Sequence, residues 1–166
     1  MAVEFHDYSF EVKGAMDDRI NGVLAECAGL IISQTKRNSR VSGEAGSRTK
    51  NSWEYKVDED SHTAYMGSNY ENAIWEEFGT GEHAIPEGGG GRKGYWVFVK
   101  GSDGKTSRSG KSYSLKEAKR VMAIMRSKGL EAYYTNGKKP SRAFWKAYTS
   151  LRGVIMKRIN NSFKGL

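Results

Sequence analysis

The chain has a single cysteine, Cys27, and no long apolar run. One cysteine excludes a disulfide within the chain, and Cys27 is expected to be a small buried side chain on the apolar face of a helix. No segment approaches the roughly 18 apolar residues that a membrane-spanning helix needs, so no membrane partner is expected. The first ten residues, MAVEFHDYSF, contain no apolar stretch of signal-peptide length. We therefore expect a protein made in a reducing compartment.

Groupings of side chains that would indicate catalysis are also scarce. The histidines are His6, His62 and His83. None has a second metal ligand at helical or hairpin spacing. The letters GTGEHA match a dinucleotide-binding loop, but such a loop follows a strand, and here a helix is predicted before it. Glu76 and Glu77 are adjacent, so on a helix they point about 100° apart and cannot flank one scissile bond. The sequence predicts no enzyme activity, no metal and no cofactor.

Charge is abundant and unevenly distributed. Lysine and arginine number 27 against 19 acidic residues, which gives a formal net charge of +8. Acidic residues cluster at 58–60 and at Glu76 and Glu77, whereas basic residues recur from Arg92 to Arg158. This excess permits binding to nucleic acid or to an acidic protein surface, and it does not choose between them. A chain with regions of opposite sign can also assemble head to tail with its own copies.

The apolar pattern predicts one α+β domain over residues 1–166. A long N-terminal helix, an antiparallel hairpin-based sheet and a C-terminal helix packed on that sheet form its frame. Residues 86–137 predict a β-α-β insert within the domain. In order, the expected elements are a helix over 15–36, a loop over 37–50, strands within 51–57 and 61–68, a helix over 70–78, a strand over 95–101, a helix over 115–128, a strand over 131–135, and a helix from 140 or 141 to 161.

Short motifs predict several details of these elements. Ser114 and Glu117 match the capping box that opens a helix. Gly79 is the expected left-handed stop of the short helix over 70–78, and Ile74 is expected on the buried stripe of that helix. The run YWVFVKG shows no obvious polar alternation, which predicts a strand covered on both faces.

One stretch carries a resemblance to a known family. SNYENAIWEEFGTG, residues 68–81, resembles the signature of the gene-product-ten-like head–tail joining proteins of long-tailed phages. That signature is a Tyr-Ala pair followed by Val-Glu-aromatic-Gly-Thr. The matching positions are Tyr70, Ala73, Trp75, Glu77, Phe78, Gly79 and Thr80. KKPSRAFWKAY, residues 138–148, looks like the start of the family's closing helix, and residues 95–135 resemble an insert seen in some members.

The resemblance implies a minor structural protein of the virion that is not an enzyme. Such neck or tail-completion proteins form a homo-oligomeric ring at the head–tail junction, and DNA passes through the lumen of the ring. The protein would be made in the host cytoplasm. Its neighbours would be a connector or stopper protein and a tail terminator or tail tube protein. We expect Trp75, Glu76, Glu77 and Phe78 to contact the next subunit as an acidic and aromatic edge that Gly79 presents.

Two other functions remain open on sequence alone. The first is a basic nucleic-acid-binding module formed by the strand, loop and helix of residues 92–120, with Tyr95, Trp96 and Phe98 available to stack bases if they are exposed. The residues expected to contact DNA or an acidic partner are Lys105, Arg108, Lys111, Lys119 and Arg120. The second is a recognition module, because the β-α-β segment is loosely similar to one unit of the sporulation-related peptidoglycan-binding repeats.

Overall fold

The protein has the predicted α+β class in a computed structural model that describes residues 6–41, 43–88, 91–101 and 106–164. It contains a long N-terminal helix, an antiparallel two-stranded sheet, a three-stranded sheet and a C-terminal helix. The chain divides into two compact units. The first comprises residues 1–70 and 143–166, and the second comprises residues 71–142. The second unit is therefore an insertion between two segments of the first.

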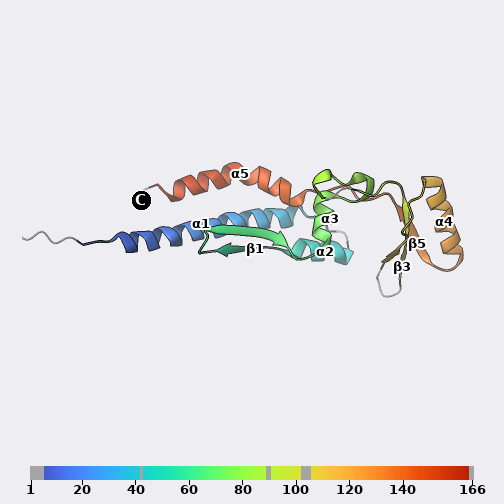
Figure 1. The fold of residues 1–166 in the computed structure, drawn as a ribbon, viewed down its shortest axis with the longest axis horizontal. Coiled ribbons are helices and arrows are strands. Elements are labelled where there is room, and N and C mark those ends of the chain that lie inside the picture. The colour runs from blue at the N-terminus through green and yellow to red at the C-terminus, as the bar shows by residue number, and fades with distance from the viewer. Residues whose placement is uncertain (1–5, 42, 89–90, 102–105, 165–166) are drawn as a thin grey trace, which may run out of the picture. The chain divides into compact units, whose positions relative to one another are not determined.

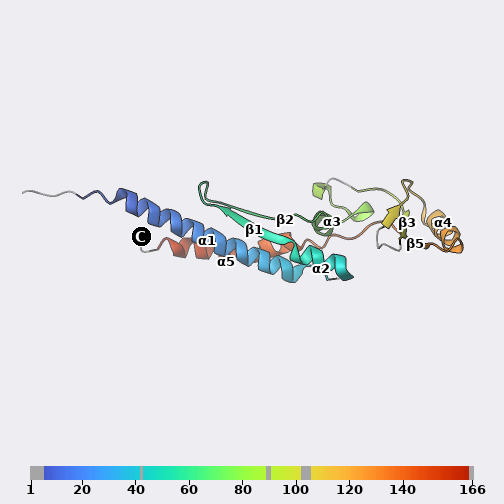
Figure 2. The same cartoon turned by 90° about the horizontal axis from the view of Figure 1, so that it is seen from below.

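The first unit is built around its two long helices (Figure 1). Its elements are α1 (Ser9–Asn38), α2 (Gly43–Asn51), β1 (Trp53–Asp58), β2 (Thr63–Ser68) and α5 (Ala143–Ser162). Figure 1 shows α1 between α5 on one side and the β1–β2 hairpin on the other. Figure 2 shows the hairpin extended along α1, with α2 beyond the C-terminal end of α1. Helix α1 is thus the layer on which both other elements pack.

The contact between α1 and α5 follows from apolar residues at helical spacing. In α1 the buried apolar residues are Cys27, Ala28, Ile31 and Ile32, all in its C-terminal half. The predicted burial of Cys27 is confirmed, and this burial raises the pKa of its thiol. Arg19 donates from Nε to the carbonyl oxygen of Ser162 at 2.7 Å, and Arg158 forms an ion pair with Glu26. These contacts align the two helices along their length.

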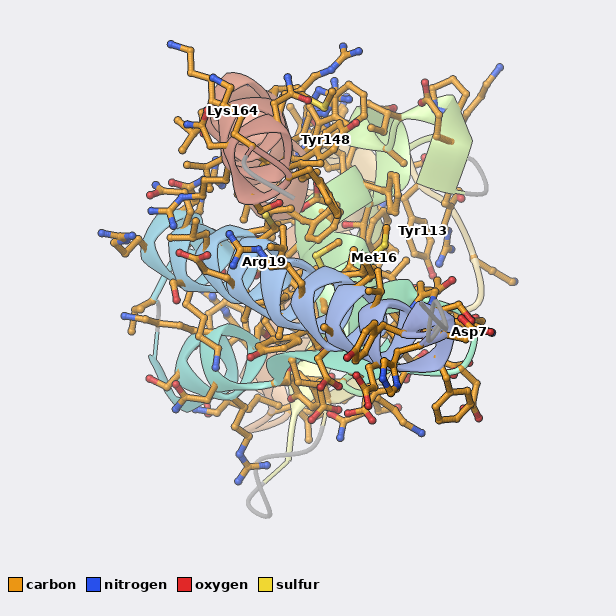
Figure 3. All side chains as sticks on the ribbon, turned by 90° about the vertical axis from the view of Figure 1, so that its left-hand side faces the viewer. Asp7, Met16, Arg19, Tyr113, Tyr148 and Lys164 are labelled. Carbon is orange, nitrogen blue, oxygen red and sulfur yellow. The ribbon has the colours of Figure 1, made fainter. Side chains whose placement is uncertain are left out.

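Helix α5 packs chiefly along α1, and its first turn reaches the hairpin. There the Phe144 ring stacks on Trp53 with centroids 5.6 Å apart and planes 12° apart. Figure 3 looks along the helix pair, with Arg19 on one side and Met16 and Tyr148 on the other. The expected packing of the C-terminal helix on the sheet is therefore limited to this first turn, because α1 lies between the rest of α5 and the strands.

The expected loop over 37–50 is wrong, because residues Gly43–Asn51 form helix α2. Serine, threonine and glycine have low helix propensity, so the local sequence did not predict this helix. Burial favours the helix instead. Thr49 is only 3% exposed, and a Cβ atom at Gly46 would lie 3.0 Å from the Arg40 carbonyl oxygen. The hairpin that follows is confirmed, with β1 and β2 antiparallel and Trp53 opposite Ser68.

The second unit contains a short helical segment followed by a small sheet covered by one helix. Its elements are α3 (Asn72–Phe78), the 3-10 turns η1 (Gly81–His83) and η2 (Pro86–Gly88), β3 (Trp96–Lys100), β4 (Thr106–Arg108), α4 (Leu115–Ser127) and β5 (Glu131–Thr135). The strand order is β4-β3-β5, with both neighbours antiparallel to β3. Strand β4 was expected as part of a basic loop, and it turns the predicted β-α-β unit into β-β-α-β.

Helix α4 covers one face of this sheet (Figure 1). The capping box is confirmed, since the Ser114 hydroxyl accepts from the Glu117 amide and the Glu117 carboxylate accepts from the Ser114 amide. Val97, Ala118 and Ala132 are at most 1% exposed and form the core between helix and sheet. The other face carries Trp96 and Phe98, which α4 does not cover. Both side chains are nevertheless half-buried, Trp96 against the turn at Gly81 and Phe98 against Tyr133, so the predicted cover on this second face comes from these neighbours and not from a helix.

Candidate functional site

Helix α3 exposes apolar side chains and buries one of its two glutamates. Ile74 and Trp75 are 54% and 41% exposed, whereas Glu77 is 8% exposed. Glu76 forms an ion pair with Lys138 through its Oε1 atom. The expected exposed acidic edge is therefore wrong for Glu77, and Glu76 is already neutralised within the unit. The expected burial of Ile74 is also wrong, because Ala73 and Glu77 occupy the buried side of the helix.

The Gly-Thr-Gly turn after α3 holds a neighbouring backbone at very short range. Thr80 donates from its amide to the Lys138 carbonyl oxygen, and its Oγ1 accepts from the Lys138 amide, both at 2.9 Å. Gly79 and Gly81 have φ angles of 77° and 61°, which residues other than glycine rarely adopt. The helix ends at Gly79 as predicted and with a positive φ, but the ψ of −179° is extended and not left-handed helical. These glycines allow two backbones to cross, so the turn is a structural junction and lacks the following helix of a dinucleotide loop.

Glu82 extends this junction with its carboxylate. Its Oε1 accepts from the Gly94 amide at 2.9 Å, and its Oε2 accepts from the Asn136 side-chain amide at 3.0 Å. These hydrogen bonds lower the pKa of Glu82, the Asn136 bond having the largest effect. The carboxylate thereby ties three separate segments of the second unit together.

The stability of the second unit should fall at acid pH because of Glu82. Its pKa is lower in the folded state than in the unfolded chain, so its contribution is complete above the ordinary value of 4.5 and is lost as the pH falls through the folded value. Hydrogen exchange of amides in residues 131–141 at a series of pH values would measure this loss. Glu82→Gln should reduce the loss of stability at acid pH, whereas the exposed control Glu87→Gln should leave this loss unchanged. If all three proteins lose the same stability at acid pH, Glu82 is not the group responsible.

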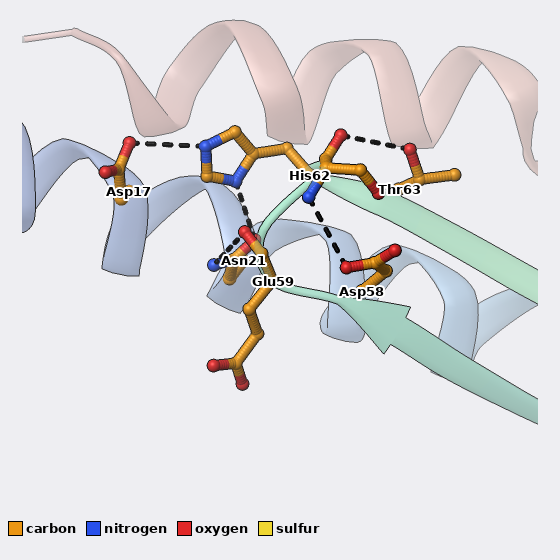
Figure 4. Close-up of polar contacts among 7 residues, drawn as sticks. Asp17, Asn21, Asp58, Glu59, His62 and Thr63 are labelled. Atoms are coloured by element: carbon orange, nitrogen blue, oxygen red, sulfur yellow. Dashed lines mark hydrogen bonds and ion pairs between the residues drawn. The ribbon is translucent and has the colours of Figure 1, made fainter.

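A polar cluster fixes the hairpin turn of the first unit to α1 (Figure 4). His62 contacts the Oδ1 atom of Asn21 through Nδ1 at 3.0 Å and the Oδ1 atom of Asp17 through Nε2 at 3.2 Å. Asn21 also donates to the carbonyl oxygen of Glu59 at 3.3 Å. His62 has a positive φ of 49°, which this anchoring supports. Over the described ranges, no three or more His, Cys, Asp or Glu residues are grouped to hold a metal ion. The cluster is a structural anchor.

The predicted basic residues do not form one site. Lys105 lies outside the described residues. Arg108 lies on β4 opposite Phe98, so it projects from the sheet face that α4 leaves open. Lys119 and Arg120 are exposed on α4, directly after the buried Ala118 that faces the sheet.

Lys111 is exposed in the connection between β4 and α4. It therefore belongs neither to the strand that carries Arg108 nor to the helix that carries Lys119. The structure distributes the predicted contacts over separate parts of the second unit.

The open face carries an aromatic surface in which Tyr133, which the sequence did not connect with the strand over 95–101, joins the aromatic residues of that strand. Phe98 and Tyr133 stack with ring centroids 5.6 Å apart and planes 25° apart. The signal was present in the run YWVFVKG, where aromatic residues alternate with valines. Trp96 and Phe98 project to one face of β3, and Val97 and Val99 project to the face that α4 covers.

Comparison with models of known protein families, with curated proteins and with solved structures gives no match. Among the helices of the described residues, none is both long enough and apolar enough to cross a membrane.

Proposed function

We propose that this chain is a structural subunit of a phage head–tail junction and forms a homo-oligomeric ring. The resemblance of residues 68–81 and 138–148 to head–tail joining proteins motivates the proposal. In this role the chain has no catalytic site. It contacts its own copies, a connector or stopper protein, and a tail terminator or tail tube protein, and its basic residues make nonspecific contact with the passing DNA.

The observation that best supports assembly is the apolar surface of the first unit. Among its described residues, twelve large apolar side chains are exposed, and only three large ones are buried, namely Ile31, Ile32 and Trp53. A unit that buries so few large apolar side chains and exposes so many is expected to cover some of them against a partner. The exposed residues are Tyr8, Phe10, Val12, Met16, Val41, Tyr55, Tyr65, Trp145, Tyr148, Val154, Met156 and Phe163.

Charge complementarity within the first unit favours a second copy as the partner that covers some of these side chains. Helix α5 contains four basic residues, from Lys146 to Arg158, and no acidic residue. The hairpin turn contains the exposed acidic pair Glu59 and Asp60. A basic helix and an acidic turn on one unit allow a heterologous contact between neighbouring copies, which closes into a ring when the rotation is suitable. Trp75, exposed on α3, is a further candidate contact.

Mass photometry of the purified chain, alone and with phage particles, tests the proposal. We expect species well above the monomer mass of 18.5 kDa. The double charge reversal Glu59→Lys/Asp60→Lys should weaken assembly at low salt, since rim charges contribute to assembly mainly through long-range attraction. The matched control Glu71→Lys/Glu87→Lys alters two exposed acidic residues of the second unit and should assemble normally. A monomer under every condition, or intact infectious virions without the protein, would exclude the proposed function.

A further inference from the structure

The face of the β4-β3-β5 sheet opposite α4 combines aromatic rings with basic side chains. We call it the open sheet face and define it by Trp96, Phe98, Arg108 and Tyr133. Phe98 is the central residue, because Arg108 lies opposite it on β4 and Tyr133 lies opposite it on β5. Directly opposite residues in a sheet project to the same face, so these three side chains form one row.

The aromatic part of this row is accessible. Tyr133 is 39% exposed and stacks on the half-buried Phe98 ring. A sheet that carries paired aromatic rings offers a flat surface on which an unpaired base can stack, as single-stranded nucleic-acid-binding sheets do.

Arginines border the same rings. The Arg126 Cζ atom lies 5.5 Å from the centroid of Tyr133, and its Nε atom donates to the carbonyl oxygen of Ala132 at 2.9 Å. The Arg92 Cζ atom lies 5.4 Å from the centroid of Trp96. These guanidinium groups are held beside the rings and carry the charge that a phosphate backbone requires.

Two serines that follow β4 hold the Arg92 side chain in place. Its Nη1 donates to the Ser109 carbonyl oxygen at 3.1 Å, and its Nε donates to the Ser112 hydroxyl at 3.0 Å. One carboxylate also lies on this face: Glu131 accepts from the Tyr133 hydroxyl at 2.6 Å and stands opposite Lys100. Basic groups therefore outnumber acidic ones around the rings, which favours a polyanionic ligand.

We propose that the open sheet face binds single-stranded nucleic acid without sequence preference. A base stacks on the Phe98–Tyr133 pair, and Arg108 and Arg126 contact the adjacent phosphates. Duplex nucleic acid hides the faces of its bases, so the site discriminates in favour of single strands. The site lies wholly within the second unit and is independent of ring formation by the first.

Fluorescence anisotropy of a labelled single-stranded oligodeoxythymidylate with the full chain tests this site. Tyr133→Leu keeps an apolar side chain but removes the stacking ring, and we expect it to weaken binding about tenfold. Arg108→Gln should weaken binding and lower the slope of log affinity against log salt by about one. Lys116→Gln is the matched control, because it removes the same charge from an exposed site on α4 and should change affinity little.

The outcomes separate this site from its alternatives. Failure of the wild-type chain to bind the oligonucleotide, or equal affinity for a duplex of the same length, overturns the proposal. It is also overturned if Lys116→Gln weakens binding as much as Arg108→Gln, which would place the contact on the outer surface of α4. Circular dichroism verifies folding of each variant. If Tyr133→Leu does not fold, the paired comparison of Arg108→Gln with Lys116→Gln still decides, because both residues are exposed.

Discussion

Trp145→Asp should weaken self-association of the chain by at least about thirtyfold, which corresponds to the loss of one interface hot spot. Trp145 is 49% exposed on α5, and its ring contacts that of Tyr148 at a centroid distance of 6.1 Å. Met156 and Phe163 follow at helical spacing on the same side and are 52% and 39% exposed. An aspartate at the start of this row of apolar side chains would place a charge in the assembled interface, where loss of its hydration opposes assembly.

Val154→Asp is the matched control for this prediction. Val154 lies on the same helix and is 46% exposed, but it is nine positions from Trp145 and therefore projects in the opposite direction. Mass photometry over a concentration series would compare both variants with the wild-type chain. We expect the Trp145 variant to remain monomeric at concentrations where the Val154 variant assembles. Equal assembly of both variants would show that the Trp145 side of α5 is not the contact.

Gly81→Ala should destabilise the second unit by about 3 kcal/mol or more. Gly81 has a φ of 61°, and a Cβ atom there would lie 2.1 Å from the Asn136 carbonyl oxygen and 2.7 Å from the Trp96 ring. The Asn136 carbonyl oxygen accepts from the Glu82 amide at 2.9 Å, so the methyl group would separate the two backbones and break that hydrogen bond. Hydrogen exchange of residues 136–138 would report the loss locally, and urea unfolding would report its size.

Gly22→Ala provides the control for the effect of adding a methyl group to a glycine. Gly22 lies within α1, and no atom outside its own helical backbone lies within 4 Å of the Cβ position. Alanine has the higher helix propensity, so this variant should be stabilised by about 1 kcal/mol or less. Wild-type exchange rates at residues 136–138 in the Gly81→Ala protein would mean that the close crossing of the two backbones does not form.

Local chemistry predicted the parts of the fold that depend on neighbouring residues. The capping box at Ser114 and Glu117, the stop at Gly79 and the alternation in the first hairpin each involve groups within a few positions of one another. Such signals act before tertiary contacts form, so they can be recognised in a single sequence. They were sufficient to predict the α+β class and most of its elements.

The candidate surfaces depended on contacts between distant residues. Glu77 was expected in an exposed edge, and it is buried because its side of α3 packs inward. Arg108 and Tyr133 are 25 positions apart in sequence, and only the pairing of β4 and β5 with β3 brings them onto one face. The helix at Gly43–Asn51 forms against local propensity, since burial of Thr49 accompanies it.

The amino-acid sequence by itself determined the helices and strands with strong periodicity, the glycine turn after Phe78 and the excess of positive charge. Only the tertiary structure decided which charged residues remain exposed, which face of the second sheet lies open and which side of α5 presents its aromatic residues. The physical reason is the distance along the chain between the residues that interact. Hydrogen-bonding patterns and side-chain periodicity are local properties of a chain, whereas burial and cross-strand neighbours are set by packing between segments far apart in sequence.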